Sequence, residues 1–426
     1  MSKHPPRVRR DRVYVWRRWI AALLFVSVAA FGVHTAAGLI PDHAAAGLER
    51  ATATAQVTTA TPVAKNTPAP KTTPTPTTTT ALGSLPSATT RLVRVDRLTG
   101  GLSPKSVVAS VSGQVFAQNM MYTHTITVFS ADRKRLATID DGVELAAYGV
   151  TGHPGTSRGA PVEMAFSPDG RTAWVSNYAM YGSGFLPEGS DACRSSQGIS
   201  DSYVYEIDTA TYSVKRVVRV GATPKYVAMT PDGKHVLVTN WCSMTLSVID
   251  TGTARVVATI ATTGRNPRGI VVSPDSRTAY VAVMGSGKVV AIDLQNKTVR
   301  DFAFTGAGPR HIVISPDGRT LYVTNDHSGT VSEVDRATGK IRRSVRVHSE
   351  PRSMTISPDG TALYVVNYSS AKVSKIRTSD MTLLQDVATD GMPIGITYEP
   401  TKKAVWVACY GGSILVYDDT ERVSAG

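Results

Sequence analysis

A proline followed by a lysine or an arginine recurs through the sequence. The five pairs are Pro104-Lys105, Pro224-Lys225, Pro267-Arg268, Pro309-Arg310 and Pro351-Arg352. Cations at equivalent positions of one surface focus a positive potential, and ammonium and guanidinium groups bind carboxylate and phosphate oxygens. The pattern therefore predicts a site for an anionic ligand. The alternative is that each cation pairs with an aspartate of a neighbouring repeat or with turn carbonyls.

The next residue after each cation differs from one copy to another. Two further copies have no cation after the proline, and read Pro161-Val162 and Pro393-Ile394. Only Glu163 and His311 have acid–base chemistry near neutral pH at this position. Together they form the catalytic hypothesis, a lactonase-type hydrolase that would use a bound divalent cation. The other interpretation is that Glu163 pairs with an arginine and His311 is hydrogen-bonded, with no cofactor or metal; this interpretation is favoured.

These residues belong to a long repeat. The turn sequence Ser-Pro-Asp-Gly and its variants place prolines at Pro168, Pro231, Pro274, Pro316, Pro358 and Pro400, and the last four intervals are 43, 42, 42 and 42 residues. The copy that begins at Pro309 contains four short stretches with alternating or β-branched residues, at 309–314, 321–324, 330–334 and 341–347, with turn residues between them. Four antiparallel strands per repeat predict the blade of a β-propeller.

Counting copies predicts seven blades. The last copy, from Pro393, contains only three strands, and the segment Arg91–Val95 resembles the fourth strand of another copy. We therefore expect an all-β, seven-bladed propeller over residues 90–426, closed by pairing between the N-terminal and C-terminal strands, which removes free sheet edges. Asparagines that follow the second strands, such as Asn240 and Asn325, are expected to serve turns.

The repeat resembles a known family. Tyr322–Asn325 has the sequence Tyr-Val-Thr-Asn, and related motifs occur at Trp174–Asn177, Leu237–Asn240 and Tyr364–Asn367. With Ser-Pro-Asp-Gly ahead of it, this motif is similar to that of the YVTN-repeat (YncE-like) β-propeller family. The resemblance implies the fold over about residues 90–418. It leaves function open, because the family includes extracytoplasmic binding or surface proteins and distant lactonase-like relatives.

The interval of 63 residues between Pro168 and Pro231 contains an insertion between Asn177 and Tyr203. Insertions on a rigid scaffold often carry recognition. Cys193 lies in the insertion, and Cys242 occupies the corresponding turn of the next copy, so we expect a disulfide between them in an oxidising compartment. Cys409 is then the odd thiol and is expected to be buried.

The N-terminal region differs in composition from the repeats. Residues 1–19 are basic, and the apolar run 20–40 is long enough to cross a bilayer, so we expect a cytoplasmic tail and a transmembrane signal anchor. A cleaved signal peptide is the alternative. Residues 41–89 are rich in Thr, Ala and Pro and are expected to form a disordered linker. Either arrangement places the propeller outside the cytoplasm, displayed on the membrane or secreted.

The chain has 426 residues, a formal net charge of +13 and three cysteines. Its cysteines form no CxxC motif, which excludes cysteine-based zinc sites and c-type haem, and HExxH and a phosphate-binding glycine loop are missing. Nucleic-acid binding is disfavoured by the expected side of the membrane. The sequence thus predicts a non-enzymatic binding module for a protein partner or an anionic cell-envelope ligand, with a channel hydrolase as the alternative.

Overall fold

The computed structural model describes residues 85–186, 191–193 and 198–422. The expected basic tail, membrane anchor and most of the linker, residues 1–84, lie outside the described residues. Within the described ranges, no helix has both the length and the apolar character needed to cross a membrane. Residues at the end of the expected linker belong to the folded structure: Ser87–Thr89 form the 3-10 helix η1, and the Ser87 N–H donates to Asp359 at 2.7 Å.

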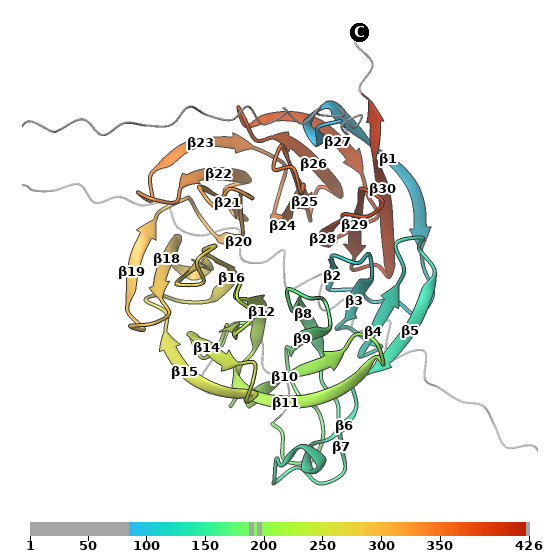
Figure 1. Ribbon diagram of the computed structural model, residues 1–426, viewed down its shortest axis with the longest axis vertical. Helices are drawn as coiled ribbons and strands as arrows, with labels where there is room; N and C mark the ends of the chain where they lie inside the picture. The colour runs from blue at the N-terminus through green and yellow to red at the C-terminus, as the bar shows by residue number, and fades with distance from the viewer. Residues whose placement is uncertain (1–84, 187–190, 194–197, 423–426) are drawn as a thin grey trace, which may run out of the picture. The chain divides into compact units, whose positions relative to one another are not determined.

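The described residues form seven four-stranded antiparallel sheets arranged as blades around one axis (Figure 1). Blade 1 consists of β2 (Ser106–Ala109), β3 (Val115–Asn119), β4 (Thr125–Phe129) and β5 (Arg135–Asp140). Blade 2 consists of β8 (Pro161–Phe166), β9 (Thr172–Asn177), β10 (Asp201–Asp208) and β11 (Ser213–Ala222). Blade 3 consists of β12 (Pro224–Met229), β13 (His235–Asn240), β14 (Thr245–Asp250) and β15 (Arg255–Ala261). The seven-bladed all-β fold is therefore confirmed.

The remaining blades repeat this order from the axis outward. Blade 4 consists of β16 (Pro267–Val272), β17 (Thr278–Val283), β18 (Lys288–Asp293) and β19 (Val299–Ala303), and blade 5 of β20 (Pro309–Ile314), β21 (Thr320–Asn325), β22 (Thr330–Asp335) and β23 (Ile341–Arg346). Blade 6 consists of β24 (Pro351–Ile356), β25 (Ala362–Asn367), β26 (Lys372–Arg377) and β27 (Thr382–Ala388). Blade 7 consists of β28 (Pro393–Glu399), β29 (Ala404–Cys409), β30 (Ser413–Arg422) and β1 (Thr90–Leu98). A small hairpin, β6 (Val143–Glu144) and β7 (Thr156–Ser157), precedes blade 2, with the 3-10 turns η2 (Leu145–Tyr148) beside it and η4 (Met284–Ser286) in blade 4.

The hydrophobic core lies between blades rather than at the axis. One cluster joins Leu237 and Val248 of blade 3 to Ile270 and Val281 of blade 4, and similar clusters fill the other boundaries. Each sheet buries both faces against its neighbours, because a lone blade would leave apolar side chains in water. The inner strands consequently stand side by side around the axis.

The Ser-Pro-Asp-Gly turn fits the space between blades. In blade 5, the Ser315 hydroxyl and the Arg319 N–H both donate to the Asp317 carboxylate, at 2.5 and 3.0 Å. Gly318 adopts a φ of 70°, and a Cβ there would lie 2.5 Å from Cγ of Pro274 in the preceding blade. The glycine is needed both for its left-handed backbone and for the close approach of the two blades.

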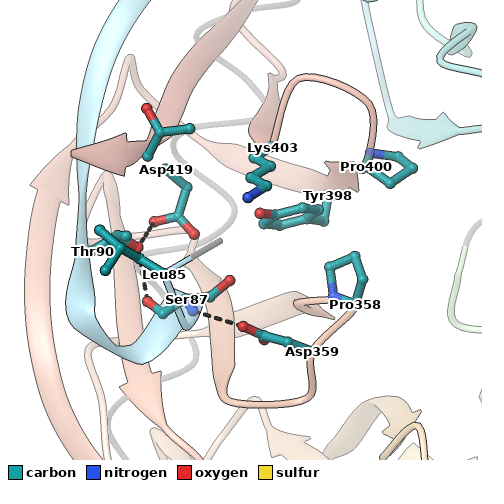
Figure 2. Close-up of a pocket in the computed structure, with 10 residues that line it drawn as sticks. Leu85, Ser87, Thr90, Pro358, Asp359, Tyr398, Pro400, Lys403 and Asp419 are labelled. Atoms are coloured by element: carbon teal, nitrogen blue, oxygen red, sulfur yellow. Dashed lines mark hydrogen bonds between the residues drawn. The ribbon is translucent and has the colours of Figure 1, made fainter. Parts of the chain in front are cut away.

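Blade 7 is completed by both ends of the folded region. Strand β1 pairs antiparallel with β30, with Arg94 opposite Tyr417 and Leu98 opposite Ile414. The expected strand closure is confirmed. Beside it, Figure 2 shows a pocket of about 230 Å³ whose lining includes Thr90, Asp359 and Asp419.

A buried ion pair joins this closure to blade 6. The Lys375 ammonium of β26 donates to the Asp419 carboxylate of β30 at 2.5 Å and to the Thr90 carbonyl of β1 at 2.8 Å, while the Tyr364 hydroxyl also donates to Asp419. Lys375 and Asp419 side chains are both fully inaccessible. One lysine therefore holds the N-terminal strand, the C-terminal strand and the preceding blade together.

The strand-ending asparagines correct one sequence expectation. None of Asn119, Asn240, Asn325 or Asn367 has a positive φ; all are buried at the ends of second strands. In blade 5 the Asn325 amide donates to the hydroxyls of Thr330 and Ser332 at 3.1 and 3.0 Å. These asparagines therefore tie the second strand to the third through their side chains, rather than supplying left-handed turn geometry.

We predict that Lys375→Met destabilises the propeller by about 3–5 kcal/mol, because it leaves Asp419 buried without its cationic partner. Urea unfolding followed by circular dichroism measures the difference. Lys340→Met, on an exposed turn, is the matched control and should change stability by less than about 0.5 kcal/mol. Equal stability of the two variants would show that the buried pair does not hold the closure.

Candidate anion site at the propeller axis

The five cations from the Pro-Lys and Pro-Arg pairs lie where the inner strands begin, at one end of the axis. Lys105, Lys225, Arg268 and Arg310 are buried, and the Arg352 side chain is 20% exposed. Burial lowers the pKa of Lys105 well below its ordinary value, and the positive charges of Arg268, Arg310 and Lys225 lower it further. The structure thus brings cations from five blades within electrostatic range of one another.

A second ring of residues surrounds these cations and was not identified from the sequence. It consists of the residue that directly follows each second strand, which we call the collar: Met120, Tyr178, Trp241, Met284, Asp326, Tyr368 and Tyr410. In six blades the collar N–H donates to the carbonyl of the residue just before the inner-strand proline, for example Asp326 to Gly308 at 2.8 Å. The fixed position after the strand-ending residue is the signal that would have revealed the collar.

A kinked backbone precedes the inner strand in five of the seven blades. The residue before the proline has a positive φ in blades 3 to 7, with values of 56° at Thr223, 61° at Asn266, 70° at Gly308, 55° at Glu350 and 59° at Met392. For a non-glycine residue this conformation costs on the order of 1 kcal/mol, and such strain concentrates at functional sites. The repeated kink places the cation beside its collar neighbours.

Lys225 is neutralised by the insertion of blade 2. The Asp191 carboxylate accepts from the Lys225 ammonium at 2.7 Å and from the Tyr178 hydroxyl at 2.8 Å. The ammonium also lies 4.3 Å from the Tyr178 ring centroid and 5.4 Å from a Trp241 ring centroid. Burial lowers the pKa of Lys225 to about 8 despite Asp191. Burial opposes ionisation of Asp191, but Lys225 and Tyr178 outweigh it and hold the pKa of Asp191 at about 2.

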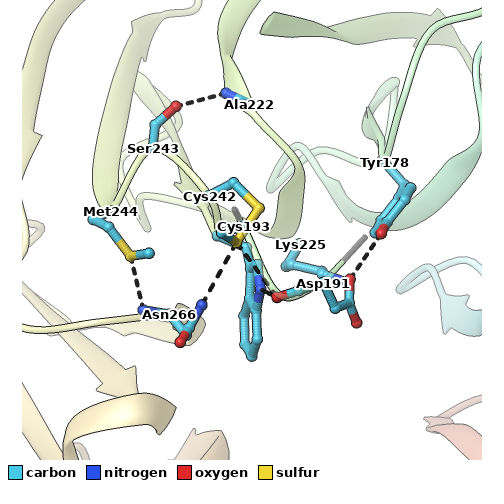
Figure 3. Close-up of a disulfide and its surroundings, with 10 residues drawn as sticks. Tyr178, Asp191, Cys193, Ala222, Lys225, Cys242, Ser243, Met244 and Asn266 are labelled. Atoms are coloured by element: carbon cyan, nitrogen blue, oxygen red, sulfur yellow. Dashed lines mark hydrogen bonds and ion pairs between the residues drawn. A yellow bond between two sulfur atoms is a disulfide. The ribbon is translucent and has the colours of Figure 1, made fainter. Parts of the chain in front are cut away.

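A disulfide fixes this part of the insertion (Figure 3). The sulfur atoms of Cys193 and Cys242 are bonded, with their Cα atoms 5.0 Å apart. Trp241, next to Cys242, donates its indole N–H to the Asp191 carbonyl at 2.8 Å. The bond therefore fastens Asp191 above the inner strand of blade 3. Cys409 is buried as a free thiol.

At blades 5 and 6, Asp326 lies between two arginines. Its Oδ1 is 3.6 Å from Arg310 Nη1 and 3.7 Å from Arg352 Nε. Arg352 also contacts the Glu350 carboxylate at 3.3 Å, and its guanidinium carbon is 3.5 Å from the Tyr368 ring centroid. These ion pairs are the arrangement that the alternative interpretation of the cations expected.

Arg268 and Lys105 differ from the other three cations. Among the described residues neither has an acidic partner within 4 Å, and neither side chain makes a hydrogen bond. The Arg268 guanidinium lies 6.0 Å from a Trp241 ring centroid, and burial lowers the pKa of Arg268 although Glu163 and Asp191 oppose this. Two residues of the ring therefore have no ion-pair or side-chain hydrogen-bond partner among the described residues.

The structure does not bring Glu163 and His311 into a hydrogen bond. His311 Nε2 is instead 2.6 Å from the Tyr226 hydroxyl, and the two rings meet edge to face. Tyr226 belongs to blade 3 and His311 to blade 5; the intervening blade has Gly269 at this position, where a Cβ would lie 2.9 Å from the Arg310 carbonyl. The missing side chain lets residues two blades apart touch.

Their protonation states also bear on catalysis. Burial, followed by Arg268 and Arg310, lowers the pKa of His311 to about 3, which makes it a weak base. Burial raises the pKa of Glu163, with Lys105 and Arg268 acting in the opposite direction. Within the described residues no group of three or more His, Cys, Asp or Glu side chains is placed to hold a metal. A divalent cation beside Glu163 would face the charges of Lys105, Arg268 and Arg310, so the donor set does not fit one.

Two family models match adjoining parts of the chain. Residues 197–302 match a model described as YNCE-like beta-propeller, and residues 299–351 match one described as Lactonase, 7-bladed beta-propeller. The expected resemblance to YncE-like β-propellers is confirmed. No curated protein sequence matches the chain.

The fold is similar to that of a solved structure, the hydrazine synthase of Kuenenia stuttgartiensis. The two chains are 20% identical, the match covers 77% of this chain and 98% of that chain, and the TM-score is 0.60. At this identity the similarity concerns the fold alone. Like the YncE-like and lactonase matches, it supports a propeller scaffold and leaves the ligand to be argued from the site.

We predict that the purified, unreduced protein contains one titratable thiol under denaturing conditions, that of Cys409, and three after reduction. A thiol-reactive chromophore in guanidinium chloride measures both values. Three thiols before reduction would show that Cys193 and Cys242 are not bonded in the protein, and the position of Asp191 above Lys225 would lose its covalent support.

Proposed function

We propose that this protein is a non-enzymatic binding module whose cationic ring recognises an anionic ligand. The supporting observation is the convergence of five cations on one end of the axis, with Arg268 and Lys105 lacking an acidic partner within 4 Å among the described residues. Concentrating buried like charges is unfavourable unless something of opposite sign offsets it. A bound carboxylate or phosphate group would supply that charge.

The position of the module is part of the proposal. Residues 20–40 would anchor it as a single-pass protein with its N-terminus in the cytoplasm, and the Thr- and Pro-rich segment would hold the propeller away from the bilayer. The disulfide supports an oxidising compartment. The ligand would then be an acidic cell-envelope component or an acidic surface of a partner protein. Cleavage after the apolar segment would release the same module as a secreted protein.

The direct test is binding of tetragalacturonate, an acidic glycan, to the full-length protein by isothermal titration calorimetry. Arg268→Gln should weaken binding at least about tenfold, because a charge-assisted hydrogen bond contributes about 1.5–3 kcal/mol. Arg255→Gln, on the exposed outer strand of the adjacent blade, is the control and should leave affinity unchanged. If both variants bind the glycan as the wild type does, the ring is not its site.

Anion binding should weaken as the pH rises from 7 to 9. The pKa of Lys225 is about 8, so its ammonium group loses its charge over this range. Titrations of tetragalacturonate at several pH values measure this dependence, and the double variant Lys105→Met/Lys225→Met should flatten it. An affinity that is constant or increases over this range would contradict the assignment.

The hydrolase alternative has support from the lactonase-propeller match at residues 299–351, which include His311. A panel of lactones, assayed with and without divalent cations, separates the two functions. The binding proposal expects no turnover above background. Turnover that Glu163→Gln abolishes would replace it with catalysis at the axis.

A further inference from the structure

In the part of the chain that the structure describes, four buried polar atoms of blades 5 and 6 have no hydrogen-bond partner. They are Arg310 Nε, His311 Nδ1, Asp326 Oδ1 and Arg352 Nε, and all belong to the inner strands or the collar. Buried polar groups in folded proteins nearly always have a partner, so each exception requires an explanation. Arg310, His311 and Asp326 are more than nine-tenths buried. Arg310 and Arg352 both lie within 4 Å of Asp326, and this grouping indicates a ligand that binds there.

The arrangement of these atoms specifies both donors and an acceptor. Asp326 Oδ1 lies 3.6 Å from Arg310 and 3.7 Å from Arg352, which is longer than a hydrogen bond. The carboxylate therefore attracts both guanidinium groups without forming a hydrogen bond to either. A ligand group that contacts all three side chains would meet N–H donors from two guanidinium groups and an oxygen acceptor from one carboxylate.

The two donors and the one acceptor indicate which chemical class of ligand fits the site. Two guanidinium groups match the oxygens of a carboxylate. The Asp326 oxygen requires a donor, which a hydroxyl group of the same ligand would supply, and its negative charge disfavours a phosphate dianion. The collar adds aromatic walls: the Tyr368 ring is stacked on Arg352, and Tyr410 meets Tyr368 edge to face with ring centroids 6.4 Å apart.

We propose that Arg310, Arg352 and Asp326 form a subsite for a hydroxy acid, specifically the uronic acid unit of an acidic glycan. The carboxylate binds the two arginines, a ring hydroxyl donates to Asp326, and the tyrosines border the sugar ring. This inference deepens the proposed function and depends on it, since it names the class of anion that the cationic ring binds.

Calorimetric titration of the full-length protein with three matched ring compounds tests the subsite. Methyl α-D-galacturonoside carries a carboxylate and hydroxyls, cyclohexanecarboxylate carries only the carboxylate, and methyl α-D-galactoside carries only hydroxyls. We expect the galacturonoside to bind at least about tenfold more tightly than cyclohexanecarboxylate, because it gains the hydrogen bond to the buried charged acceptor. The galactoside and inorganic phosphate should bind more weakly than the galacturonoside.

Asp326→Asn assigns this selectivity to one residue. It should reduce affinity for the galacturonoside about tenfold and leave cyclohexanecarboxylate unchanged or stronger, whereas Arg352→Gln should weaken both carboxylates. Asp132→Asn, on an exposed turn, is the control. The wild-type comparison remains decisive if Asp326→Asn unfolds.

The outcomes distinguish the two proposals. Equal affinity of the wild type for the two carboxylates, or tighter binding of phosphate, overturns the hydroxy-acid subsite and leaves anion binding intact. If tetragalacturonate and both ring carboxylates fail to bind, the proposed function itself fails.

Discussion

The pairing of β1 with β30 is the constraint on which the remaining structure depends. Each blade has two apolar faces, so no blade is stable without neighbours on both sides, and an open stack would expose one face at each end. Joining the first and last strands in blade 7 closes the stack into a ring. Closure also places all seven inner strands around one axis. A residue that recurs about every 42 positions in the sequence therefore becomes part of a cluster in space. The cationic ring is thus a consequence of the repeat and its closure.

The charges at the axis are balanced unequally around the ring. At blade 3, an aspartate from the insertion neutralises Lys225 through a hydrogen-bonded ion pair, and a disulfide fastens that aspartate in place. At blades 5 and 6, Asp326 attracts two arginines without hydrogen-bonding to either. Arg268 lies between these regions. A ligand therefore meets one side of the ring that is already satisfied and another where Arg310 Nε, Arg352 Nε and Asp326 Oδ1 lack hydrogen-bond partners within the described residues.

Much of this arrangement could be predicted from the sequence, because local and periodic patterns determine it. The repeat length, the Ser-Pro-Asp-Gly turn and the resemblance of Arg91–Val95 to a fourth strand were sufficient to predict seven blades and their closure. The cations were found for the same reason, since their proline partners mark a constant register. The collar was missed because its members differ in type, from Met120 to Trp241 to Asp326, and only their position is constant. The Tyr226–His311 contact was also missed, because it crosses a whole blade and depends on the small volume of Gly269.

The most direct measurement of the central claim is a crystal structure of the protein soaked in sodium bromide, with anomalous diffraction to locate the bromide ions. We expect an anomalous peak at the axial end of the inner strands, within contact distance of Arg268, Arg310 or Arg352, because a small anion needs only the converging positive charges to bind. Bromide bound at exposed lysines and arginines elsewhere, with no peak at the axis, would contradict the assignment of the ring as an anion site.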